Sequence, residues 1–187
     1  ILAANARDID AAKAAGKGRA TTYDASMGLR AMHHVELRSA LHAALAGNQL
    51  ELHYQPVFRL DTGGLDGFEA LLRWQHPERG WISPADFIPA AEESNQIITI
   101  GRWVLDQAAR QLAHWRRLTG PAGHHLTMAV NLSPRQLSDA NLVTDLRGIL
   151  GDAGLEPSAL CLEITEGAVV ANATVAARAL AELRAIG

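Results

Sequence analysis

Three oxygen-bearing side chains that suit metal binding stand near the ends of three predicted strands. They are Glu69 in GFEALLRW, Asn131 in LTMAVNLS and Glu163 in LCLEITE. Side chains alternate between the two faces of a strand, and in each segment the face opposite to these residues is apolar. A carboxylate within a buried strand is costly unless it is paired, hydrogen-bonded or bound to a metal ion. Glu69 therefore requires such a partner elsewhere in the chain.

The same three residues lie toward the carboxyl ends of their strands, the edge that carries the active site in α/β barrels. Neighbouring strands lie about 4.8 Å apart, so three adjacent strands would bring these side chains within roughly 10 Å of one another. Two carboxylates and an amide oxygen favour Mg²⁺ or Mn²⁺ over zinc or copper. Arg73 shares the face of Glu69 and suits a phosphate group. Together these residues indicate phosphate-ester chemistry.

A simpler interpretation stays open on spacing alone. In it, Glu69 pairs with Arg73, while Asn131 and Glu163 make only local hydrogen bonds. Two aromatic residues also remain open: His53 is expected to pack or to face solvent, and Trp81 fits either a lid contact or plain packing.

The elements that would position these residues follow an α/β order. A hairpin comes first, then helices and strands alternate, which predicts a mainly parallel sheet. Ser83 before a proline and Ser133 three residues before Gln136 predict helix starts with side-chain caps. The predicted strands are 50–60, 65–74, 126–133 and 160–166, and the predicted helices after the hairpin are 98–117, 141–152 and 174–185.

The first residues read as a separate piece. Residues 3–15 predict a helix and 19–23 a short strand, which together cannot bury a core. We therefore expect residues 1–28 to end a preceding domain, 29–47 to hold a connecting helix (35–46), and 48–187 to form the main domain. The chain begins with Ile1, which we interpret as a cut rather than a native start.

Composition excludes several classes of protein. The chain has 187 residues and a net charge of −3, so no basic surface indicates nucleic acid or an anionic membrane as a partner. Its single cysteine rules out an intramolecular disulfide framework, and no apolar run reaches 18 residues. The lack of disulfides suits a reducing cytosol, and together with the nucleotide substrate implied below it leads us to expect a cytoplasmic location, with an anchor elsewhere in a longer parent left open.

Several segments match one known family in order and spacing. YQPVFRL, GFEALLRWQHPERGWISPADFIPAAEE, IGRWVL, AVNLSPRQL and LEITEG make residues 36–187 similar to the EAL phosphodiesterase domain, which hydrolyses cyclic di-GMP. The earlier segment AAKAAGKGRATTYDASM resembles the tail of a GGDEF diguanylate cyclase domain. The resemblance implies a partial modified TIM (β/α)8 barrel with an antiparallel first strand, preceded by a helix–strand remnant of another domain.

The resemblance also assigns roles within the site. It implies that Gln55 touches a guanine, that Arg73 holds a substrate phosphate and that Glu166 steadies the loop after its strand. Two Mg²⁺ or Mn²⁺ ions would activate a water that cleaves cyclic di-GMP to linear pGpG. A homodimer through the complete domain is also implied. The implied metal ligands are Glu69, Asn131 and Glu163.

One departure from the family pattern limits this expectation. The chain stops at LRAIG, where the family pattern continues with a DDFG segment and its paired aspartates. The lysine, glutamate and glutamine that the family carries on later strands are absent too. Two ions need about a dozen coordination positions. We therefore expect a parent cyclic-guanylate-specific phosphodiesterase, no complete catalytic set in this chain, and no meaningful hydrolysis by it alone. An open barrel edge predicts poor solubility, oligomers or partial order. Two alternatives remain. The first is a non-catalytic cyclic di-GMP receptor or protein-interaction module with an EAL-like fold, and the second is a bare structural or dimerisation fragment.

Overall fold

The structure is a computed structural model that describes residues 25–164 and 173–187. The chain divides into two compact units, residues 1–36 and 37–187, and the second carries the features discussed below. The predicted helix 3–15 and strand 19–23 lie outside the described residues. Their assignment to a preceding domain, and the division at residues 28 and 47, therefore stay predictions.

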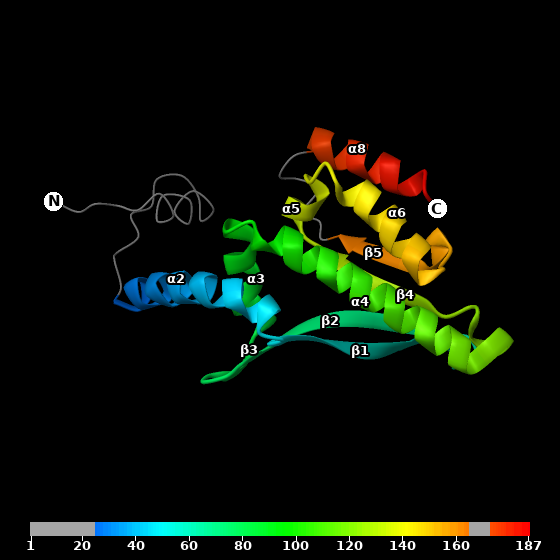
Figure 1. The fold of residues 1–187 in the computed structure, drawn as a ribbon, viewed down its shortest axis with the longest axis horizontal. Coiled ribbons are helices and arrows are strands. Elements are labelled where there is room, and N and C mark those ends of the chain that lie inside the picture. Colours follow the sequence, from blue (N-terminus) through cyan, green and yellow to red (C-terminus); the bar gives the residue numbers. More distant parts are fainter. Residues whose placement is uncertain (1–24, 165–172) are drawn as a thin grey trace. The chain divides into compact units, whose positions relative to one another are not determined.

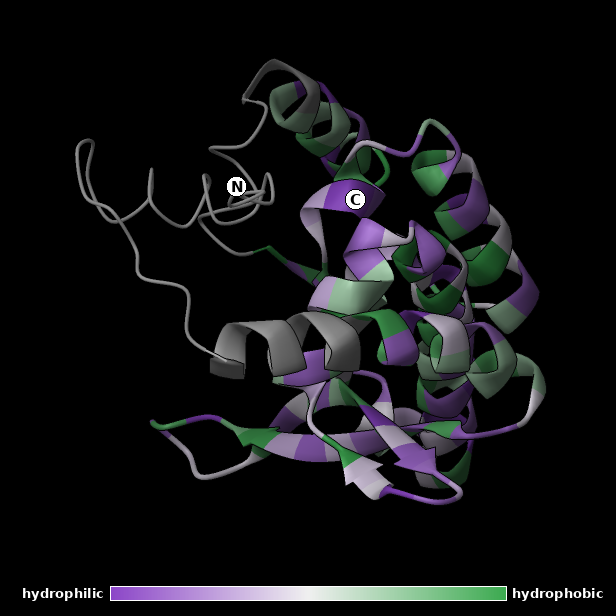
Figure 2. Cartoon of the chain, turned by 90° about the vertical axis from the view of Figure 1, so that its left-hand side faces the viewer, coloured by the Kyte–Doolittle hydropathy of each residue, from purple (hydrophilic) through white to green (hydrophobic). Residues whose placement is uncertain are grey.

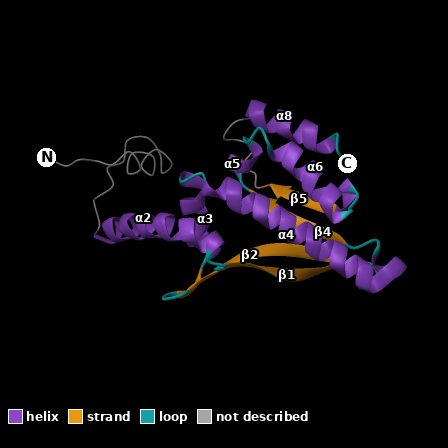
Figure 3. Ribbon diagram, viewed as in Figure 1, coloured by secondary structure: helices purple, strands orange, loops and turns teal. Residues whose placement is uncertain are grey.

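An open mixed sheet forms the base of the second unit (Figure 3). Its strand order is β1-β2-β4-β5, with the short β3 paired to β2. β1 and β2 are antiparallel, whereas β2, β4 and β5 run parallel. The predicted hairpin and the antiparallel first strand are thus confirmed within an α/β fold. The strands are β1 (Leu50–Phe58), β2 (Leu65–His76), β3 (Gly80–Ile82), β4 (Thr127–Leu132) and β5 (Leu160–Ile164).

Helices α4, α6 and α8 of the second unit lie side by side over one face of this sheet (Figure 1). The longest, α4, contacts β1, β2 and β4. The α-helices are α2 (Ala25–Ala46), α3 (Pro84–Glu93), α4 (Gln96–Thr119), α5 (Pro134–Leu137), α6 (Leu142–Ala153) and α8 (Ala173–Arg184), and the short 3-10 helices are η1 (Gly120–Gly123) and η2 (Pro157–Ala159).

Alternation along the strands separates the core from the opposite face. Trp74, Met128 and Val130 point toward the helices and are completely buried or nearly so. Trp115 of α4 packs on the rings of Tyr54 and Phe68, which lie on the same side of β1 and β2. Figure 2 shows hydrophilic and hydrophobic residues interspersed along the strands and helices, as expected for elements with one buried and one exposed side. Burial of this one apolar face supplies the main driving force for folding.

The predicted helix caps are both present. The Ser83 hydroxyl accepts a hydrogen bond from the backbone N–H of Ala85, with Pro84 at the first helical position. Ser133 and Gln136 form a complete capping box, in which each side chain accepts from the other residue's backbone N–H. This box fixes the turn directly after β4, where Asn131 lies.

Two elements differ from the sequence prediction. Helix α2 begins at Ala25 rather than near residue 35, because alanine, leucine, methionine and arginine make up most of residues 25–32 and favour helix, despite Ser26 and Gly28. Strand β3 was not predicted, since three residues with one buried side chain carry no periodic signal. It forms through its partner strand, in the register Trp74 with Ile82.

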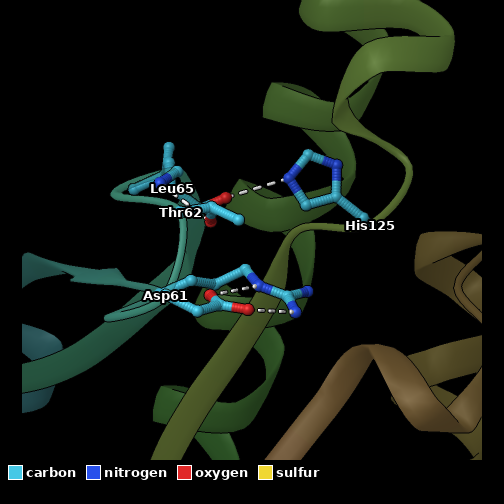
Figure 4. A network of polar contacts seen from close by, with 6 residues as sticks. Asp61, Thr62, Leu65 and His125 are labelled. Atoms are coloured by element: carbon cyan, nitrogen blue, oxygen red, sulfur yellow. Dashed lines mark hydrogen bonds and ion pairs between the residues drawn. The ribbon is translucent and has the colours of Figure 1, made fainter.

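The tip of the β1–β2 hairpin is tied to the segment that leads into β4 (Figure 4). Nε2 of His125 lies 2.9 Å from the carbonyl oxygen of Leu65. On the turn itself, the Arg59 guanidinium donates to both carboxylate oxygens of Asp61. The contact by His125 helps to align β2 with β4, which are far apart in sequence. No helix among the described residues combines the length and the hydropathy that a membrane span needs.

Candidate functional site

Four of the residues predicted for the site come together on the sheet face opposite the helices that the structure describes. Gln55 of β1 lies directly opposite Glu69 of β2, and Asn131 of β4 lies opposite Glu163 of β5. Glu69 is in register with Ala129, so Asn131 stands two residues further along the same face of the neighbouring strand. Four strands thus contribute polar side chains to this side of the sheet, which we call the polar face.

A hydrogen bond joins the two central members of the polar face. Nδ2 of Asn131 donates to Oε1 of Glu69 over 2.8 Å. This bond links β2 to β4 at the point where the two strands stop pairing. It satisfies one carboxylate oxygen of Glu69 and fixes the direction of both side chains.

The alternative pairing of Glu69 with Arg73 does not occur. Among the described residues Arg73 forms no ion pair, and its Nη1 donates to the carbonyl oxygen of Leu72 over 3.0 Å. The remaining N–H groups of its half-buried guanidinium stay available for a planar anion such as a phosphate.

The expected burial of Glu69 needs correction. Asn131 and Glu163 are exposed and Glu69 is only half-buried, because the helices of the described chain cover the opposite face of the sheet. A half-exposed carboxylate with a hydrogen bond has a small desolvation cost. The described part of the chain therefore accommodates Glu69 without a metal ion.

The fit of these residues to a divalent cation is partial. Two carboxylates and an amide on adjacent strands form an all-oxygen set, the donor type that Mg²⁺ and Mn²⁺ prefer. Asn131 directs its amide Nδ2 toward Glu69, so its oxygen would have to turn inward to join the carboxylate in binding a cation. No cluster of three histidine, cysteine or acidic side chains that suits a metal occurs in the described ranges. Metal binding by Glu69, Asn131 and Glu163 stays a prediction.

A cavity of about 370 Å³ opens beside the polar face, and the sequence did not predict it. Pairing between β2 and β4 ends at Ala70 and Val130, after which the strands diverge. The gap is lined by Arg73 and Asn131 on one side and by apolar residues of α3 and α4 on the other. Such an apolar hollow with a few polar groups at its edge is typical of small-molecule sites.

Glu92 lines the same cavity from α3 and has no counterpart in the sequence prediction. Burial raises the pKa of its carboxyl group, and the positive charge of Arg135 partly opposes that rise. A carboxyl group with a raised pKa in a hollow is a frequent feature of binding sites. The predicted loop-stabilising residue Glu166 lies outside the described residues.

Comparison with known proteins decides the family. Residues 38–187 match the family model described as the EAL domain. The chain belongs to the EAL family. The expectation drawn from its motifs is therefore confirmed for this region, while a GGDEF tail before it stays a prediction.

The relatives of this EAL region include proteins of cyclic di-GMP metabolism. The chain is 42% identical over 177 residues to the bifunctional diguanylate cyclase/cyclic di-GMP phosphodiesterase MucR of Pseudomonas aeruginosa, covering 94% of this chain and 25% of MucR. It is 38% identical over 176 residues to the cyclic di-GMP phosphodiesterase PdeR of Escherichia coli, covering 94% of this chain and 26% of PdeR.

A solved structure shows the same fold. The PaMucR phosphodiesterase in complex with cyclic di-GMP superimposes with a TM-score of 0.75 at 43% identity, over 81% of this chain and 60% of that chain. The chain spans about a quarter of the length of these two curated relatives. The activity of any whole protein that contains this EAL region is therefore a matter of proposal.

Proposed function

We propose that this EAL region forms the amino-terminal half of a cyclic di-GMP phosphodiesterase barrel. The single observation that carries the proposal is the convergence of Glu69, Asn131 and Glu163 on one face of three consecutive parallel strands. The named activities of MucR and PdeR support the same substrate. Further strands would close the barrel around the polar face.

The residues of this chain would hold the cation and the substrate in complementary ways. The carboxylates of Glu69 and Glu163 supply negative charge at the sheet edge, and Asn131 fixes the orientation of Glu69. Arg73 would donate to the phosphate oxygens, and Gln55, opposite Glu69, would contact a guanine. A bound Mg²⁺ or Mn²⁺ would withdraw charge from the phosphodiester and help to activate a water. The water oxygen would form a bond to phosphorus as the bond from phosphorus to the ribose oxygen breaks; the water would lose a proton, the leaving ribose oxygen would gain one, and linear pGpG would result.

Three side chains fall well short of the coordination that two cations need, about a dozen positions. We therefore propose that the 187-residue chain binds a cation weakly and does not by itself hydrolyse cyclic di-GMP at a useful rate. Dimer formation through the complete domain, and a preceding GGDEF domain, belong to the same proposal. The match to MucR supports the latter, because it covers 94% of the chain and so includes residues before the EAL region.

Binding of Mn²⁺ to the chain tests this function directly. Electron paramagnetic resonance of free Mn²⁺ during a titration should report weak binding that Glu69→Gln and Glu163→Gln each reduce severalfold. Glu182→Gln provides the matched control, since Glu182 is a carboxylate of α8 paired with Arg178. Equal Mn²⁺ affinity in all four proteins would contradict the assignment of the metal ligands.

A non-catalytic receptor is the second candidate, and the Asn131–Glu69 hydrogen bond favours it, since it satisfies the polar face without a cation. A receptor should bind cyclic di-GMP equally well with Mg²⁺ and with a chelator. Binding that strengthens with Mg²⁺ and weakens in Glu69→Gln would instead favour the enzyme.

A further inference from the structure

Trp81 is the exposed tryptophan of the described chain. Its side chain lies in β3 and is 54% exposed, whereas Trp74 is completely buried and the other two tryptophans pack against the core. An indole ring in water forfeits a large favourable burial energy. Its exposure leaves indole surface accessible to a ligand.

Strand register places Trp81 on the polar face. In the antiparallel pairing of β2 with β3, Trp81 lies opposite Gln75. Gln75 is separated from Arg73 by two residues and from Glu69 by six, so all three point to the same side of the sheet. Trp81 therefore lies on the same face of the sheet as the predicted metal ligands, near the end of β2 that carries Arg73.

A neighbouring histidine brings the indole toward the predicted site. The rings of Trp81 and His53 lie 5.6 Å apart at 70° in a T-shaped contact. His53 is opposite Leu71, and the next pair on this face, Gln55–Glu69, lies two residues away on each strand. Two residues span about 7 Å along a strand. The aromatic pair is thus anchored two residues along β1 from the position opposite Glu69.

The orientation of this pair is fixed from the β1 side. Nε2 of His53 lies 2.6 Å from a carboxylate oxygen of Glu51, and Glu51 is opposite Arg73 in the register. A T-shaped contact uses at most one face of the indole, so at least one face of Trp81 remains for another planar group.

We propose that Trp81, braced by His53, is a stacking platform for one guanine of cyclic di-GMP, while Arg73 holds the adjoining phosphate. This inference rests on the proposed function, because it takes its ligand from it. A planar base suits the exposed indole face, and base–aromatic stacking contributes strongly to nucleotide binding. The arrangement of an arginine beside an aromatic ring matches the phosphate and base of one nucleotide. Trp81 would determine affinity for the base and take no part in the chemistry.

Calorimetric titration of the 187-residue chain with cyclic di-GMP tests the platform. Trp81→Ala should raise Kd about tenfold, and Trp81→Phe should raise it less. Leu118→Ala is the matched control, because Leu118 is also an exposed large apolar residue but lies in α4. Ribose 5-phosphate, which lacks a base, should bind equally to the wild type and to Trp81→Ala. Cyclic di-GMP should also protect Trp81 from acrylamide quenching, a signal that Trp81→Phe abolishes.

The outcomes separate this inference from the proposed function. Unchanged cyclic di-GMP affinity in Trp81→Ala overturns the platform and leaves the function intact. If Trp81→Ala also loses the binding of ribose 5-phosphate, the substitution disturbs the polar face in general, and a role of Trp81 limited to the base is overturned. If Trp81→Ala weakens the binding of cyclic di-GMP but Arg73→Ala does not, the stacking role of Trp81 is supported and the assignment of the phosphate to Arg73 is overturned. Absence of cyclic di-GMP binding by the unchanged chain overturns both.

Discussion

A buried arginine clamp between α4 and the sheet gives the sharpest stability prediction. Arg116 is 9% exposed, and its Nε and Nη2 donate to the carbonyl oxygen of Leu126 over 3.0 and 2.7 Å. Its Nη1 donates to Glu156 over 2.6 Å. One side chain thus joins the end of α4, the residue before β4 and the segment that leads into β5.

Replacement of Arg116 by methionine keeps most of the aliphatic stem and removes all three hydrogen bonds. The carbonyl of Leu126, which is buried, loses both donors, at a cost of about 1–3 kcal/mol. The bond to Glu156 adds less than about 1 kcal/mol, because that carboxylate is 53% exposed. We expect Arg116→Met to lower the free energy of unfolding by about 3 kcal/mol. For a chain of this size the thermal midpoint should fall by about 6–12 °C.

Urea and thermal unfolding followed by tryptophan fluorescence measure this effect, since Trp115 lies next to Arg116 in the core layer. Arg110→Met is the matched control: Arg110 is on the same helix, its side chain is 60% exposed, and within the described residues it pairs with Asp106 one turn away. That variant should lose about half a kcal/mol. If Arg116→Met is no less stable than Arg110→Met, the clamp does not stabilise the fold and the reasoning is refuted.

Two further predictions concern pH and close packing. The hydrogen bond from Arg116 holds the pKa of Glu156 below its ordinary value of 4.5, so this carboxylate adds stability above that pH and the contribution disappears as pH falls through the lowered pKa. The stability difference between wild type and Glu156→Gln, measured by urea unfolding, should accordingly be present at pH 7 and vanish in strong acid; a difference independent of pH would contradict it. Gly67→Ala should destabilise by about 2 kcal/mol or more, because the new Cβ would lie 2.3 Å from the backbone oxygen of Thr127. Gly148→Ala, where nothing lies within 4 Å, should instead stabilise α6 by about 0.5–1 kcal/mol, and equal effects of the two in thermal unfolding would disprove the steric argument.

Local rules of chain geometry explain what the sequence could predict. The alternation of side chains along a strand depends only on position, so it placed Glu69, Asn131 and Glu163 on one face before any pairing was known. The caps at Ser83 and Ser133 depend on a few consecutive residues and were equally accessible.

Features that depend on contacts between distant segments were missed. The cavity arises because β2 and β4 stop pairing after Ala70, a detail of register that no single segment records. Strand β3 forms through its pairing with β2, so no local pattern of residues could place Trp81 on the polar face. Glu69 is half-exposed because the described helices cover the other face of the sheet. The apolar residues on either side of Glu69 in the sequence indicate a buried strand instead.

The polar face shows how folding and cation binding can be separated in this chain. If Glu69 were deeply buried, the fold would need a cation to offset the desolvation of its charge. Instead, the carboxylate is half-exposed and accepts a hydrogen bond from Asn131, so its cost is small and already offset. A cation would have to displace that amide hydrogen bond, which weakens binding to the described residues alone. Under the proposed function, further ligands would have to add affinity for the cation, whereas the fold of the described residues does not depend on one.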